Sequence, residues 1–115
     1  MIKTKSVYYD KAEANDGIRI LVMRRWPRGI SKEKAKVDRW IKELGPSNEL
    51  LSEWNKSKIN FAEYKTRYLK EMQMQTQKIR ELAEVAGKNT LTLLCHEKSD
   101  AECHRRLLKE LIEKA

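Results

Sequence analysis

The sequence predicts an α/β fold: a small single-domain sandwich over residues 1–115, with a short, mainly parallel sheet and about four helices. Two short apolar runs, "IRILVM" (18–23) and "TLTLLC" (90–95), have the composition of buried strands. Helical periodicity and capping residues fill the segment between them, which suits a crossover between parallel neighbours. At 115 residues, the chain is long enough for one core and too short for a second large module.

The first predicted element is an edge strand over 2–8, where apolar and polar residues alternate and lysines occupy polar positions. The strand at 18–23 follows and ends abruptly at "RRWPRG". Pro27 cannot donate a backbone hydrogen bond, and Gly29 permits a positive φ. We therefore expect 24–30 to be a shaped loop that leaves the end of this strand.

Capping residues predict where the helices between the two strands begin. Ser31 precedes apolar residues at helical spacing, which predicts a helix over 31–44. Ser47 is the predicted N-cap of a short second helix. Asn60 opens a long helix to about Ala86, and the weakly periodic segment "EMQMQTQKIR" predicts a bend or fraying within it.

A last helix is predicted over about 100–114, because Ser99 with Glu102 forms a capping-box pattern. On a helical wheel His104 falls at the centre of the apolar face, so its ring should point inward. The residues on either side of His104 flank this face.

Cysteine and histidine side chains are expected to meet near the carboxyl edge of the sheet, where ligands bind in open α/β folds. Cys95 ends the second strand, and His104 lies near the start of the helix that follows. A helix N-terminus favours anions and lowers the pKa of a nearby thiol. Cys95 and His104 are therefore the candidate catalytic residues, and Arg105 is a candidate ligand-binding residue. The competing interpretation is that Cys95, Cys103 and His104 only fill the core.

The "RRWPRG" loop should reach the same edge if the two strands are parallel neighbours. Guanidinium groups suit phosphate and carboxylate recognition, so Arg24 and Arg28 are candidate ligand-binding residues. Trp26 is a third candidate, because its ring could stack on a ligand. Arg24 or Arg28 should then lie within one ligand's width of Cys95 around a concave opening. If these residues only pack the loop, no such opening is required.

We expect no metal site. The ligand types in Cys95, His96, Cys103 and His104 suit zinc, but the spacing C-x7-C matches no common zinc motif. Adjacent side chains on a strand or a helix also diverge.

The charge balance points to an anionic partner. The formal net charge is +8, and the basic excess is heaviest in the first thirty residues. No apolar run approaches the length of a membrane span, and the first residues lack the apolar core of a signal peptide, so we expect a cytoplasmic protein without a membrane partner. Two cysteines in such a chain are expected to stay reduced.

Two stretches of the sequence resemble a known family. "ILVMRRWPRGISKEKAKVDRWIKELGPSNEL" resembles the hallmark region of the YeaO-like family, the domain of unknown function four-eight-eight, and "TLLCHEKSDAECHRRLL" resembles its Cys…Cys-His-Arg ending. The resemblance runs from about Ile18 to Leu111 and implies a small cytoplasmic α/β protein of uncharacterised biochemistry. The chain departs from the family at Met23, where other members often have Asp.

The function that these observations favour is a site for an anionic small ligand bearing a phosphate or a carboxylate. The sequence leaves open whether the protein is an enzyme that uses Cys, His and Arg side chains. A nucleic-acid-binding module that uses the basic first half and Trp26 is the alternative, as is a structural or interaction protein without a catalytic site. Cofactor, substrate and oligomeric state are not predicted.

Overall fold

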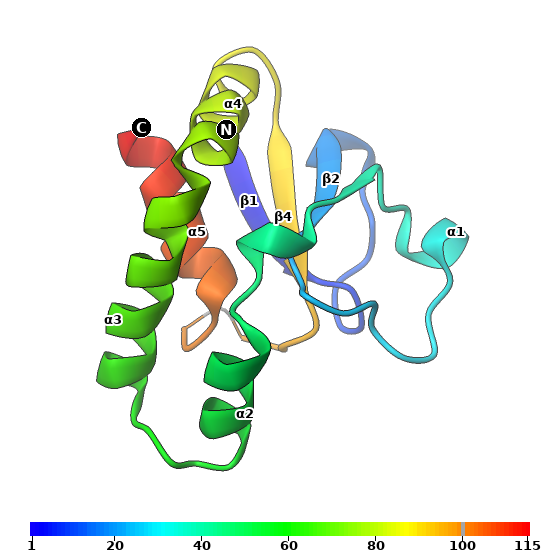
Figure 1. The fold of residues 1–115 in the computed structure, drawn as a ribbon. Coiled ribbons are helices and arrows are strands. Elements are labelled where there is room, and N and C mark those ends of the chain that lie inside the picture. The colour runs from blue at the N-terminus through cyan, green and yellow to red at the C-terminus, as the bar shows by residue number, and fades with distance from the viewer. Residues whose placement is uncertain (100) are drawn as a thin grey trace.

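The computed structural model describes residues 1–99 and 101–115, and its centre is a four-stranded parallel sheet with the strand order β1-β4-β2-β3 (Figure 1). The strands are β1 (Ile2–Ser6), β2 (Ile18–Leu21), β3 (Arg39–Trp40) and β4 (Leu91–Cys95). β2 and β4 are direct neighbours, with Ile20 opposite Leu93. The predicted α/β class, the parallel sheet and the edge position of the first strand are confirmed.

The helices surround this sheet in the order that the capping residues predict. They are α1 (Lys32–Ala35), α2 (Asn48–Asn55), α3 (Phe61–Met72), α4 (Thr76–Ala86) and α5 (His104–Lys114). The side chains of Ser31, Ser47 and Asn60 each accept a backbone N–H at the start of α1, α2 and α3. The predicted long helix is interrupted by a 3-10 turn at Gln73–Gln75, inside the weakly periodic segment.

The predicted helix over 31–44 is wrong. α1 ends after one turn, Lys36 takes a left-handed conformation with φ 51°, and β3 then pairs with β2. The cause is Arg19, whose guanidinium donates to the carbonyl oxygens of Ala35 and Lys36 and so takes the acceptors a continuing helix would use. Asp38 completes the turn by accepting the backbone N–H of Arg19 at 2.9 Å.

The predicted start of the last helix is also wrong. α5 begins at His104 with Cys103 as its N-cap, and residues 101–103 form turns and bends. Ser99 accepts the backbone N–H of Ala101 instead of capping a helix, and residue 100 lies outside the described residues. Cys103 therefore keeps an extended backbone, with φ −135° and ψ 145°, just before the first helical turn.

The two faces of the sheet pack against different parts of the chain. One face carries the larger core, in which strand residues such as Ile20 and Leu93 pack against α3, α4 and α5. The other face packs against α1 and the segment after it through Leu21, Leu94 and Val37. None of the helices in the described part of the chain is long and apolar enough to cross a membrane.

Candidate functional site

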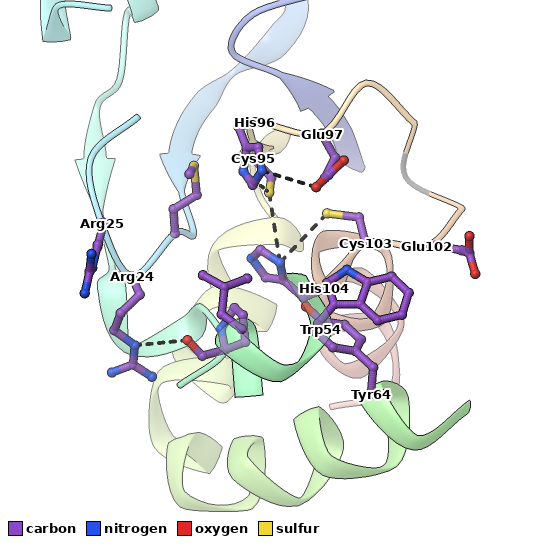
Figure 2. A pocket seen from close by; sticks show the side chains of 13 residues that line it. Arg24, Arg25, Trp54, Tyr64, Cys95, His96, Glu97, Glu102, Cys103 and His104 are labelled. Atoms are coloured by element: carbon purple, nitrogen blue, oxygen red, sulfur yellow. Dashed lines mark hydrogen bonds and ion pairs between the residues drawn. The ribbon is translucent and has the colours of Figure 1, made fainter. Parts of the chain in front are cut away.

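A pocket opens at the carboxyl ends of β2 and β4, between the loop after β2, the helices α2 and α3, and the start of α5 (Figure 2). Its lining is largely apolar, with charged groups around it. The lining residues are Met23, Arg24, Arg25, Pro46, Leu51, Trp54, Tyr64, Cys95, His96, Glu97, Glu102, Cys103 and His104.

Cys95 is the last residue of β4 and is 1% exposed. Alternate residues of a strand point to the same face, so Cys95 shares the face of Leu91 and Leu93, which is the face that α5 covers. Its Sγ therefore points toward the start of α5, where Cys103 and His104 lie (Figure 2).

The ring of His104 is held in one orientation by the backbone. Its Nε2 lies 2.5 Å from the carbonyl oxygen of Val22, at the end of β2. A carbonyl oxygen only accepts, so Nε2 donates to Val22, and Nδ1 is the ring nitrogen that faces the sulfur atoms. Nδ1 lies 4.0 Å from Cys95 Sγ and 3.8 Å from Cys103 Sγ. The ring thus presents Nδ1 to both thiols.

Cys95, Cys103 and His104 form what we call the thiol cluster. The hydrogen bond from Cys103 lowers the pKa of Cys95 well below its ordinary value of 9.0, and the neighbouring His104 adds to this effect against burial. The pKa of Cys103 is raised, first by its hydrogen bond to Cys95 and then by burial. Cys95 is therefore the thiol of the pair that ionises more readily.

His96 stands at the open side of the cluster. Its Nδ1 lies 3.7 Å from Cys95 Sγ, and its Nε2 lies 3.2 Å from a carboxylate oxygen of Glu97. The hydrogen bond with Cys95 raises the pKa of His96 above its ordinary value of 6.5, although partial burial opposes the change. The imidazole ring is half exposed and adjoins the Cys95 sulfur.

The ligand atoms of the thiol cluster all lie within 4.8 Å of one another, so these three residues could supply three of the four ligands of a thiophilic metal ion. The sequence argument that adjacent side chains diverge fails for Cys103 and His104. Because Cys103 is an extended N-cap rather than a helical residue, both side chains turn toward Cys95.

Arg24 and Arg25 lie at the opposite side of the pocket from Cys103 and Glu102 (Figure 2). The Arg24 guanidinium is fixed by two donations, from Nε to the Pro46 carbonyl at 3.3 Å and from Nη2 to the Gly45 carbonyl at 3.0 Å. A Cβ at Gly45 would lie 2.6 Å from the backbone nitrogen of Arg24, so a glycine is required for this close approach. Carbonyl partners do not neutralise the guanidinium, so its positive charge remains available to an anion.

Three other candidate residues lie elsewhere. Arg28 is exposed and does not line the pocket. Trp26 donates from Nε1 to the Ile30 carbonyl at 2.7 Å, and its ring and that of Trp40 meet in a T-shaped arrangement with centroids 5.5 Å apart. Arg105 is 2% exposed and donates from Nη1 to the Glu97 carbonyl at 2.8 Å, so it braces the loop after β4 from outside the pocket.

Sequence reasoning missed the aromatic wall of the pocket. Trp54 and Tyr64 lie with ring centroids 5.0 Å apart, and the buried Tyr68 continues the series to His104, with centroids 5.5 Å apart. The helical spacing of Tyr64 and Tyr68 indicated a buried stripe. Whether these aromatic side chains reach the pocket depends on how α3 packs against α5. No local sequence pattern encodes that packing.

Comparisons with known proteins identify relatives over nearly the whole chain. The family model described as "Active DUF488-N3 subclade" (DUF488-N3a) matches residues 2–115. The uncharacterized protein YeaO of Escherichia coli K12 is 40% identical over 109 residues, which cover 95% of this chain and 94% of the relative. The uncharacterized protein Rv3073c of Mycobacterium tuberculosis H37Rv is 31% identical over 104 residues, which cover 90% and 87%. No solved structure gives a significant match.

Proposed function

The chain belongs to the DUF488-N3a family, and from its own pocket we propose that it is an enzyme acting on a small anionic molecule that bears a phosphate or a carboxylate. One observation carries the proposal. A single pocket at the carboxyl edge of the sheet is lined by Arg24 and by the thiol cluster, although these residues lie some seventy positions apart in the sequence.

The binding half of the proposal rests on Arg24. Its guanidinium is oriented by backbone carbonyls, so an anion that reaches it meets a fixed donor fork without the cost of ordering a long side chain. Between Arg24 and the thiols the wall is apolar, formed by Leu51, Trp54 and Tyr64 among others. The ligand that fits has an apolar body and one negatively charged end.

The chemical half rests on Cys95 and His104. Cys95 is the nucleophile, since the thiolate rather than the thiol attacks an electrophile and Cys95, which lines the pocket beside His104, is the thiol of the pair that ionises more readily. His104 is the proton partner, because its Nδ1 faces both sulfurs while Nε2 is committed to Val22. The ring takes the proton that Cys95 loses as it ionises and returns it to the group that leaves the substrate.

A matched pair of variants tests the binding half. Inorganic phosphate, sulfate and a nucleotide should raise the melting temperature of the protein through mass action. Arg24→Ala should abolish the increase, whereas Arg28→Ala, which removes the same charge from the same loop outside the pocket, should preserve it. The proposal is wrong if no anion stabilises the protein, or if the two variants respond alike.

The nucleic-acid alternative depended on stacking by Trp26, and the packing of that ring against Trp40 argues against it. Binding to single-stranded DNA through phosphates would weaken with salt, with a log–log slope of about −0.7 per phosphate. We expect Trp26→Ala to leave any such binding unchanged in a fluorescence titration. A clear loss of affinity in this variant would restore the alternative.

A further inference from the structure

The thiol cluster contains a second nucleophile that the proposed reaction does not use. Cys103 is 2% exposed and lines the same pocket as Cys95, from the N-cap of α5. The two Sγ atoms lie within 4.8 Å of one another, and both face Nδ1 of His104, at 4.0 Å and 3.8 Å (Figure 2). If Cys95 acted only as a nucleophile, it would not need the sulfur of Cys103 beside it.

We propose that Cys95 and Cys103 are a dithiol that a hydroperoxide oxidises to an intramolecular disulfide, reversibly blocking the pocket. This inference rests on the proposed function, because it makes Cys95 both the nucleophile of the site and the residue whose oxidation silences it. The oxidant reaches the cluster through the pocket, which both cysteines line.

The reaction proceeds in two balanced steps. The Cys95 thiolate attacks one oxygen of the hydroperoxide, so that an S–O bond forms, the O–O bond breaks and the other oxygen leaves as an alcohol or water after taking a proton. Cys103 then attacks the sulfur of the resulting sulfenic acid. The S–S bond forms, the S–O bond breaks, His104 Nδ1 accepts the Cys103 proton and passes it to the departing hydroxide, and water leaves. Two thiols are oxidised and one hydroperoxide is reduced.

The position of each cysteine suits its step. Cys95 is fixed at the end of a central strand, where it pairs with Ser6 of β1 and its carbonyl oxygen accepts the backbone N–H of Val7 at 2.9 Å. Cys103 precedes the first turn of α5, and its side chain caps no backbone group. The Sγ atoms must approach to about 2.05 Å to bond. This movement displaces the residue before the helix rather than a strand in the middle of the sheet.

Peptide mapping tests the proposal directly. The reduced full-length protein is treated with hydrogen peroxide, thiols are blocked, and trypsin cleaves after Lys98, between the two cysteines. The expected product is a pair of peptides joined through Cys95 and Cys103, which dithiothreitol separates. Two free peptides after peroxide treatment would overturn the inference.

Single variants assign the order of the two steps. In Cys103→Ala the sulfenic acid on Cys95 has no partner, so dimedone should trap it and irreversible overoxidation should increase several-fold. In Cys95→Ala the remaining Cys103 should react with peroxide many-fold more slowly. Equal peroxide reactivity of the two variants would overturn the assignment of Cys95 as the first nucleophile.

Two measurements separate failure of this inference from failure of the proposed function. Rapid alkylation of Cys95 by iodoacetamide, without any disulfide under peroxide, refutes the dithiol and leaves the proposed nucleophile in place. Resistance of Cys95 to alkylation in the folded protein refutes both. Stoichiometric zinc in the purified protein, measured by elemental analysis, would also refute both, because the ion would occupy both sulfurs and Nδ1.

Discussion

Two buried polar clusters sit on opposite faces of this sheet, and they are built in contrasting ways. Around Asp16, here called the Asp16 cluster, Lys3, Lys5 and Arg19 form ion pairs at 2.7, 2.8 and 2.6 Å. In the thiol cluster the sulfur–nitrogen contacts are 3.8 and 4.0 Å long, and its residues line an opening.

The contrast separates a group that holds the fold together from one that acts on a ligand in the proposed function. Asp16 is 1% exposed, and its carboxylate is already paired with cationic side chains, so it is not accessible to a ligand. Its backbone oxygen also accepts from Thr92 in the central strand at 2.7 Å, which ties the turn before β2 to β4. The thiol cluster instead places two thiols and a ring nitrogen beside an opening, which is the arrangement that the proposed reaction needs.

The largest expected effect comes from breaking the Asp16 cluster. Asp16→Asn leaves three cations around a neutral amide, all three of them in strands, and should lower the free energy of unfolding by about 3 kcal/mol. Urea denaturation measures the loss. Glu13→Gln removes only the exposed partner of Lys5 and should cost far less. If Asp16→Asn lowered the free energy of unfolding as little as Glu13→Gln does, the Asp16 cluster would not stabilise the fold.

Acid should affect the Asp16 cluster next. Burial alone raises the pKa of Asp16, but hydrogen bonds from Lys3, Lys5 and Arg19 hold it well below its ordinary value of 3.8. A lowered pKa in the folded state stabilises the protein above 3.8, and this contribution is lost as pH falls below that value. Stability measured from neutral pH downward should therefore decline less steeply in Asp16→Asn. An unchanged pH profile would contradict the assignment.

The sequence predicted the meeting of distant segments better than it predicted their local structure. Two apolar runs separated by helices were enough to place β2 and β4 side by side, and this brought Arg24 and Cys95 to one edge. The short strand β3 was missed because the apolar residues of the segment 31–44 do recur at helical spacing, which predicted a helix there. A buried Arg19 from another strand decides that α1 ends, and its carbonyl partners are visible only in the folded chain.

Local sequence patterns also could not predict the details of the pocket, because contacts between distant segments decide them. A capping-box pattern at Ser99 suggested an earlier helix start, which would have turned Cys103 and His104 apart. Loop residues Arg24 and Arg28 have equivalent chemistry in the sequence. In the folded chain the carbonyls of Gly45 and Pro46 hold the Arg24 guanidinium, and Arg24 lines the pocket whereas Arg28 is exposed.

The thiol cluster should show the reverse behaviour of the Asp16 cluster: small changes in stability and large changes in reactivity. Cys103→Ala removes a small buried side chain that caps nothing, at a cost of about 1 kcal/mol. It also removes the hydrogen bond that contributes most to the lowered pKa of Cys95. The pH midpoint of Cys95 alkylation by iodoacetamide should rise, and the rate near neutral pH should fall several-fold. An unchanged midpoint would mean that Cys103 does not lower the pKa of Cys95.

The smallest effect should come from His96, whose hydrogen bond is the last of the main causes that lower the pKa of Cys95. His96→Asn removes the half-exposed imidazole ring from beside the Cys95 sulfur, and water screens the interaction that is lost. The alkylation midpoint of Cys95 should rise by less than in Cys103→Ala, and the melting temperature should stay nearly the same. Lys98→Ala, which changes a charge on the same loop next to Tyr9, is the control and should leave the midpoint unchanged. If His96→Asn shifts the midpoint more than Cys103→Ala does, the half-exposed His96 rather than the buried Cys103 has the larger effect on the pKa of Cys95. The contrast between the two clusters would then rest on solvent exposure instead of on the buried pair of thiols.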